Sequence, residues 1–128
     1  MTVARLTTLA ALALALAVAV VPVASAKDGH GVRVGGVCTH SSTAKLKLSR
    51  DDGRIEIEFE VDQNRNGVRW NVTLQRNGAR IASTAARTRG PSGSFEVRRL
   101  IAQTHATNRI TAVATRASAE WCTASAAI

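Results

Sequence analysis

The chain has 128 residues, a formal net charge of +8, two cysteines, two tryptophans and no tyrosine. This length fits one domain plus a targeting segment, and the scarcity of aromatic side chains argues against a nucleic-acid platform built on base stacking. The surplus of basic residues favours anionic partners, because opposite charges attract.

Residues 1–26 have the three parts of a secretory signal peptide. Arg5 gives the start a positive charge, Leu6–Val21 is an apolar run, and Ala24–Ala26 offers small residues for cleavage. The run is shorter than the ~20 apolar residues of a membrane-spanning helix. We therefore expect cleavage after Ala26 and a mature chain without a membrane anchor, located outside the cell or at its envelope.

The mature chain carries one pair of cysteines, Cys38 and Cys122, near its two ends. In an oxidising compartment such a pair is expected to form a structural disulfide. Two free thiols or a metal pair are the alternatives, but no further ligands cluster near them in the sequence. In the chain-entropy model, a disulfide that closes a loop of this length stabilises the folded protein by about 4–5 kcal/mol.

Segments at both ends of the mature chain lack a clear strand pattern. Residues 27–42, which include Cys38 and four glycines, are expected to form a flexible leader. Residues 125–128 are expected to form a frayed tail. The domain itself is predicted to span residues 43–124.

Alternation of apolar and polar residues predicts a first hairpin around the turn Asp52-Gly53. A two-residue turn fixes which residues face each other, and a slip by one residue would exchange the two faces of the hairpin. The predicted register places four pairs opposite one another: Leu48 with Ile57, Leu46 with Phe59, Lys47 with Glu58, and Lys45 with Glu60.

A second hairpin is predicted around Asn77-Gly78. Its first strand contains Trp70, Val72 and Leu74 in alternation with polar residues, and its second strand spans residues 79–87, with Leu74 opposite Ile81. A loop follows at residues 89–93. Three shorter strands are predicted near residues 95–100, 109–115 and 121–123.

These elements predict an all-β fold, a seven-stranded antiparallel β-sandwich. In strand number and pattern, residues 44–123 resemble an immunoglobulin or fibronectin type III domain, and Trp70 stands where immunoglobulin domains place their core tryptophan. The chain departs from that family because it lacks the tyrosine of the tyrosine corner and carries its cysteines on the first and last segments. Its alanine-rich, arginine-over-lysine composition resembles small secreted proteins of high-GC actinobacteria. The resemblance implies a fold but no specific activity.

Charge is the one functional signal in the sequence. Residues 27–62 hold six basic and seven acidic side chains, whereas residues 63–119 hold ten arginines against Glu96 alone. Guanidinium groups bind phosphate and carboxylate bidentately. The candidate partners are therefore a wall polymer, an anionic lipid, extracellular nucleic acid or an acidic protein. The competing interpretation is a solvated surface that keeps the protein soluble and monomeric. The candidate anion contacts are Arg65, Arg69, Arg76, Arg80, Arg87 and Arg89.

No catalytic or metal-binding arrangement is predicted. Nucleophile, base and acid are not combined in any recognisable motif, and the glutamates of the first hairpin are expected to pair with lysines. Asp62–Gly67 matches half of a calcium loop, but Thr73 stands where the bidentate glutamate belongs. His30, His40 and His105 lie in unclustered positions. We expect no cofactor.

The sequence therefore predicts a secreted, non-catalytic binding or structural module whose cationic half contacts acidic polymers or proteins at the cell envelope. The alternative is a protease-inhibitor or small-ligand carrier domain that acts through an exposed loop at Arg87–Ser92.

Overall fold

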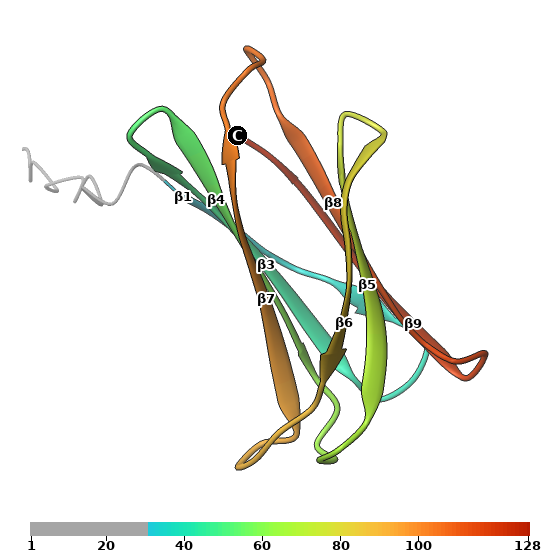
Figure 1. Ribbon diagram of the computed structural model, residues 1–128. Coiled ribbons are helices and arrows are strands. Elements are labelled where there is room, and N and C mark those ends of the chain that lie inside the picture. Colours follow the sequence, from blue (N-terminus) through green and yellow to red (C-terminus); the bar gives the residue numbers. More distant parts are fainter. Residues whose placement is uncertain (1–30) are drawn as a thin grey trace, which may run out of the picture.

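The computed structural model describes residues 31–128, so the expected signal peptide and its cleavage site lie outside the described residues. The described part contains nine strands. It contains no helix, and thus none long and apolar enough to cross a membrane. The strands form two antiparallel sheets packed face to face (Figure 1). The predicted all-β antiparallel sandwich is thus confirmed, but the predicted number of seven strands is wrong.

One sheet has four strands and the other has five. The four-stranded sheet has the order β1 (Gly31–Gly35), β3 (Thr43–Asp51), β4 (Arg54–Asp62) and β7 (Ser94–Ala102). The five-stranded sheet has the order β2 (Val37–Cys38), β9 (Glu120–Ala127), β8 (Arg109–Arg116), β5 (Arg69–Arg76) and β6 (Ala79–Arg87). The edge strands β6 and β7 lie on the same side of the sandwich (Figure 1).

The two additional strands lie in the segment expected to be a flexible leader. β1 pairs with β3 in the four-stranded sheet, and β2 pairs with β9 in the five-stranded sheet, so the chain changes sheets at Gly36. A Cβ atom on Gly36 would lie 2.6 Å from the carbonyl oxygen of Thr123 and 2.9 Å from Cβ of Ala44. Only glycine fits this crossing. The expected tail is also ordered, because β9 continues to Ala127.

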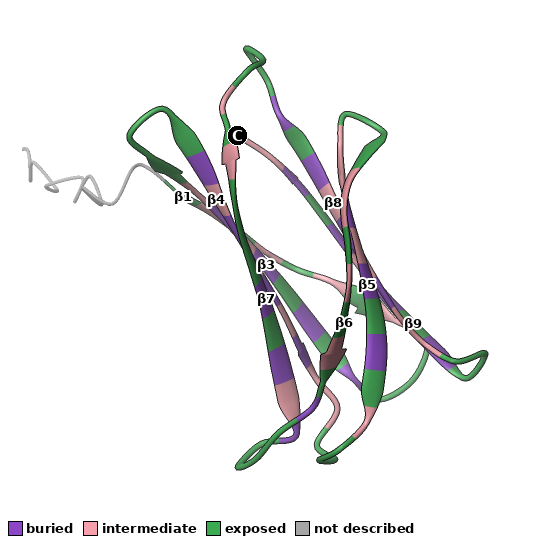
Figure 2. Ribbon diagram, in the orientation of Figure 1, coloured by how far each residue is buried: buried purple, intermediate pink, exposed green. Residues whose placement is uncertain are grey.

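The register predicted for the first hairpin is confirmed. Leu46 lies opposite Phe59 and Lys47 lies opposite Glu58 in the β3–β4 pairing. The large apolar members of the hairpin are fully buried in the core, and buried positions alternate with partly exposed ones along β4 (Figure 2). One face of the hairpin therefore builds the core while the other carries charge.

The second hairpin differs from its predicted register by one residue. Both turn residues, Asn77 and Gly78, have positive φ angles of 49° and 86°, as the turn signal requires. However, the pairing shifts between Leu74 and Gln75, so that Leu74 faces Ala82 instead of Ile81. A β-bulge of this kind inserts one extra residue into one strand and has no clear sequence signature here.

Trp70 is fully buried in the core, as the resemblance to immunoglobulin domains implied. Its ring packs against Phe95 with the ring centroids 6.0 Å apart. With Trp70 on the third predicted strand, β3 and β4 correspond to the first two strands of an immunoglobulin domain, which lie in one sheet there as they do here. The disulfide differs, because it joins β2 and β9 of the same sheet instead of linking the two sheets. The shared feature is therefore the sandwich architecture.

Candidate anion-binding groove

A groove of about 660 Å³ lies at the open side of the sandwich, where the edge strands β6 and β7 meet. Its lining includes small or apolar side chains such as Ala86 and Phe95. Two acidic residues, Glu60 and Glu96, also line it. Five arginines line the groove: Arg69, Arg87, Arg89, Arg98 and Arg99.

Two of these arginines form a like-charged pair. Arg69 on β5 lies directly opposite Arg87 on β6, and both are exposed. Like charges directly opposite each other in a sheet are destabilising. One guanidinium nitrogen of Arg87 donates a hydrogen bond to the carbonyl oxygen of Gly67 at 2.7 Å, a neutral acceptor that does not cancel the charge. Neither guanidinium forms an ion pair with an acidic residue of the described chain.

Thr88 fixes this end of the sandwich. Its side chain is only 1% exposed. Its hydroxyl donates to the carbonyl oxygen of Arg65 at 2.5 Å and accepts a hydrogen bond from the backbone amide of Val68 at 2.9 Å. A Cβ atom on Gly93, whose φ is +72°, would overlap the backbone of Arg65. The loops β4–β5 and β6–β7, which lie at the same end in Figure 1, are thereby joined.

These contacts also define the loop Arg87–Ser92. Because Thr88 is buried, the segment is not an extended, freely exposed strand at its start. Arg89 exchanges backbone hydrogen bonds with Ser94 and accepts one from the amide of Gly93, which closes a tight turn. The loop therefore presents Arg89 at the groove rather than a long protruding segment.

The structure brings together four of the six candidate arginines and separates the other two. Arg76 and Arg80 lie beside the turn of the second hairpin, at the opposite end of β5 and β6. At a rise of ~3.3 Å per residue, the eight residues of β5 place the two ends about 23 Å apart. A guanidinium nitrogen of Arg76 donates to the carbonyl oxygen of Ala102 at 2.7 Å. Gathered at the groove end are Arg65, Arg69, Arg87 and Arg89.

Arg99 is a groove residue that sequence reasoning did not select. It lies opposite Ile57, which is fully buried, so it occupies a core-facing register position on the edge strand β7. The available signal was the broken alternation, in which Phe95 and Val97 are buried but the next residue of the series is an exposed arginine. An inward charge on an edge strand also discourages edge-to-edge pairing.

Arg98 contributes less free charge than the other groove arginines. Its guanidinium forms ion pairs with Glu58, with Glu56 at 3.9 Å and with Glu96 at 3.7 Å. None of Arg65, Arg69, Arg87, Arg89 and Arg99 forms an ion pair with an acidic residue among residues 31–128. The uncompensated charge at the groove therefore lies on Arg69, Arg87 and Arg89 near β6 and on Arg99 of β7.

The outer face of the four-stranded sheet has paired charges, as expected. Lys45 lies 3.6 Å from Glu60 and Lys47 lies 3.0 Å from Glu58. The pKa of the Glu58 carboxyl is below its ordinary value, mainly because Lys47 donates a hydrogen bond to it. Partial burial opposes this effect, while the charges of Lys47 and Arg98 reinforce it. This face is therefore close to electrically neutral.

The oxygen atoms of Asp62–Gly67 hold the loop in place. A carboxylate oxygen of Asp62 accepts a hydrogen bond from the amide of Asn64 at 2.9 Å. The carbonyl oxygens of Arg65 and Gly67 accept from Thr88 and Arg87. Oxygen atoms of this loop therefore take part in the turn at Asn64 and in the orientation of Arg87.

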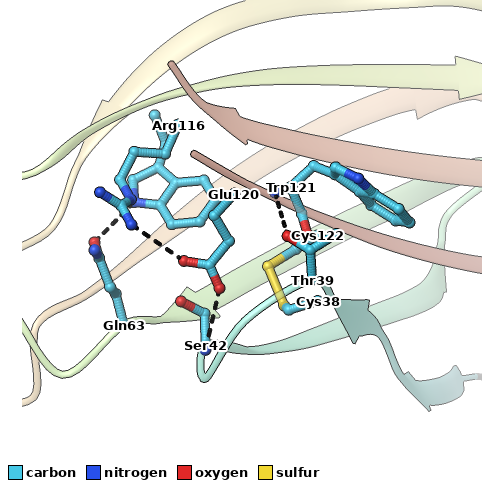
Figure 3. Close-up of a disulfide and its surroundings, with 9 residues drawn as sticks. Cys38, Thr39, Ser42, Gln63, Arg116, Glu120, Trp121 and Cys122 are labelled. Atoms are coloured by element: carbon cyan, nitrogen blue, oxygen red, sulfur yellow. Dashed lines mark hydrogen bonds and ion pairs between the residues drawn. A yellow bond between two sulfur atoms is a disulfide. The ribbon is translucent and has the colours of Figure 1, made fainter. Parts of the chain in front are cut away.

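Cys38 and Cys122 form the predicted disulfide, with an S–S distance of 2.06 Å (Figure 3). Beside it, Glu120 is only 4% exposed. Its carboxylate accepts a hydrogen bond from the amide of Ser42 at 3.2 Å and lies 3.5 Å from the guanidinium of Arg116. Glu120 lies within 4.8 Å of both sulfur atoms, but these are bonded to each other. The contacts of Glu120 therefore link the start of β9 to Ser42 and Arg116, and no pattern in the sequence indicated them.

The buried cluster continues into the core. The guanidinium carbon of Arg116 lies 5.9 Å from the centroid of the Trp70 ring. The indole nitrogen of Trp70 donates a hydrogen bond to Gln63 at 3.1 Å.

Comparisons with protein-family models, with curated proteins and with solved structures find no significant match to this chain.

Proposed function

We propose that this protein is a secreted, non-catalytic binding module that holds the acidic groups of a polymer or protein at the arginine groove between β6 and β7. The opposition of Arg69 and Arg87 carries the proposal. Two guanidinium groups that repel each other in the free protein are stabilised when an anion binds between them, because the anion attracts both.

Local geometry supports the same function. Thr88 and Gly93 join the two loops at this end, and the carbonyl oxygen of Gly67 orients Arg87. Guanidinium groups held in fixed positions lose less conformational freedom on binding than mobile ones. Arg89 adds a third unpaired charge to the same groove.

The sequence supports a setting outside the cytoplasm. The signal-peptide pattern of residues 1–26 and the disulfide between Cys38 and Cys122 both fit an oxidising compartment. The acidic groups available there are phosphates of wall polymers, lipids and nucleic acids, and carboxylates of acidic polysaccharides and proteins. These groups share the chemistry that an arginine groove binds.

Binding of polyanions across a salt series tests the proposal. The panel contains polyglutamate, a wall teichoic acid, duplex DNA and vesicles with an anionic lipid. Reversing two groove charges, Arg87→Glu with Arg89→Glu, should weaken binding at least about tenfold and reduce the salt slope by about 2, since each phosphate contact contributes a slope of about 0.9.

The matched control reverses Arg50 and Arg109, which are exposed and form no ion pair with the acidic residues of the described chain. The control variant has the same net charge as the groove variant, but its reversed charges lie outside the groove. We therefore expect it to lose much less affinity for the polyanion. An equal loss in both variants would mean that diffuse net charge, and not the groove, attracts the polyanion.

A further inference from the structure

β6 is a long edge strand with one unpaired side. Within residues 31–128 it pairs with β5 alone, so the backbone amides and carbonyls of its other side have no strand partner. β1 and β2, the other edges formed by the N-terminal segment, have five and two residues. β7 carries the edge charges Arg98 and Arg99. Short strands and edge charges both block strand addition, so β6 is the most accessible edge.

The composition of β6 suits the close approach of another strand. Its central segment, Ala82–Ala86, contains only alanine, serine and threonine, without charge or proline. The bulge lies before this segment, which pairs regularly with β5. Small side chains leave the backbone edge open to a partner. The segment lacks the charged residues and prolines that usually prevent an edge strand from pairing with another strand.

Charge at the two ends of this segment restricts the partner. Arg80 precedes it and Arg87 follows it, both exposed, and neither forms an ion pair with an acid in the part of the chain described. A second copy of β6 added antiparallel would place Arg80 opposite Arg87, and a parallel copy would place each arginine beside its equivalent. Both arrangements repel, whereas acidic side chains at both ends of the added strand would attract.

We propose that an extended acidic peptide adds to the edge of β6 as a further strand, a mode that rests on the proposed anion-binding function of the groove. Its backbone pairs with Ala82–Ala86, and its terminal carboxylates reach Arg80 at one end and Arg87 at the other. Main-chain hydrogen bonds then give affinity and the arginines give selectivity. This mode explains why unpaired arginines stand at both ends of β6 and not only at the groove.

The test uses a synthetic peptide with two aspartates at each end and alternating threonine and valine between them. Backbone hydrogen exchange of the protein is measured with and without the peptide. Amides of Ala82–Ala86 that exchange rapidly in the free protein should become protected. The same peptide with alternate backbone nitrogens methylated keeps its charge but loses donors on one edge, and it should bind at least about tenfold more weakly if those bonds carry affinity.

Protein variants separate the charges from the strand edge. Arg80→Glu and Arg87→Glu should each weaken binding of the peptide, while Arg50→Glu, on β3 of the other sheet, should not. If polyglutamate still binds in an Arg87-dependent manner while Ala82–Ala86 stay unprotected, strand addition is overturned and the proposed function stands. If no acidic ligand binds, the proposed function itself fails. Protection that grows with protein concentration alone would show self-pairing and overturn the acidic peptide as occupant.

Discussion

Arg69 lies directly opposite Arg87 across the antiparallel pair β5–β6, and neither guanidinium has an acidic partner among the described residues. Removing one charge should relieve repulsion. We expect Arg69→Thr to stabilise the free protein by about 0.2–1 kcal/mol at low salt and to weaken polyanion binding. Urea unfolding at low and high salt measures the effect, which should shrink as salt screens the pair.

Arg80→Thr is the matched control for this prediction. It removes the same charge from the same sheet and introduces the same β-branched residue, but Arg80 faces the uncharged Gln75. Its gain in stability should be smaller and less dependent on salt. If the two variants gain the same unfolding free energy, strand propensity and total charge explain the effect. Repulsion between Arg69 and Arg87 would then not be its cause.

Glu58 gives the fold a predictable dependence on pH. Its pKa is lowered in the folded protein, so the unfolded chain binds its proton more tightly. The resulting stabilisation is complete above the ordinary value of 4.5 and is lost as the pH falls through the lowered pKa. The difference in unfolding free energy between the wild type and Glu58→Gln should therefore be largest near neutral pH and shrink in acid.

Glu60→Gln serves as the comparison for Glu58. The Glu60 side chain is 39% exposed and lies 3.6 Å from a lysine that is itself 65% exposed. Exposed pairs contribute little, so this variant should change stability less at every pH. The measurement runs from about pH 3 to about pH 7, because carboxyl groups ordinarily titrate at a pKa of roughly 4. If the difference in unfolding free energy between the wild type and Glu58→Gln does not change over this range, Lys47 and Arg98 are not its stabilising partners.

The sequence predicted the first hairpin correctly because two independent patterns agreed on one register. Apolar pairs such as Leu46 with Phe59 and charged pairs such as Lys47 with Glu58 both require the same alignment. The second hairpin has only its apolar face to define the register. The bulge after the turn therefore shifted Leu74 by one residue without leaving a visible signal.

Features that depend on contacts distant in sequence could not be predicted. β1 reads as a glycine-rich leader, and its order comes from pairing with β3. The six candidate arginines were selected by their charge alone, although the predicted turn at Asn77-Gly78 already separates Arg76 and Arg80 from Arg69 and Arg87. What the structure adds is the groove at the far end of the hairpin. Arg99 was visible as a break in alternation, but its position at the groove depends on β7 being an edge strand on the same side of the sandwich as β6, the edge of the other sheet.

Gly36 is the position where the first part of the chain crosses between the sheets. A methyl group there would lie 2.6 Å from a carbonyl oxygen of β9 and 2.9 Å from Cβ of Ala44, so Gly36→Ala should force the crossing apart. We expect a loss of about 1–3 kcal/mol from overpacking, measured by urea unfolding. Gly35→Ala is the control, because a Cβ atom at Gly35 meets nothing within 4 Å. Equal effects would show that backbone flexibility, and not the close approach, explains the loss.

Glu120 joins the turn between β8 and β9 to the start of β3 beside the disulfide (Figure 3). Glu120→Ala removes the acceptor of the Ser42 amide and the partner of Arg116, so we expect a loss of about 3 kcal/mol, near the lower limit for a broken buried pair because Arg116 is partly exposed. Glu120→Gln keeps an acceptor for Ser42 and should lose less. Asp51→Ala breaks an ion pair whose side chains are 54% and 51% exposed and should change little. Equal unfolding free energies for Glu120→Ala and the wild type would show that this cluster does not hold the end of the sandwich together.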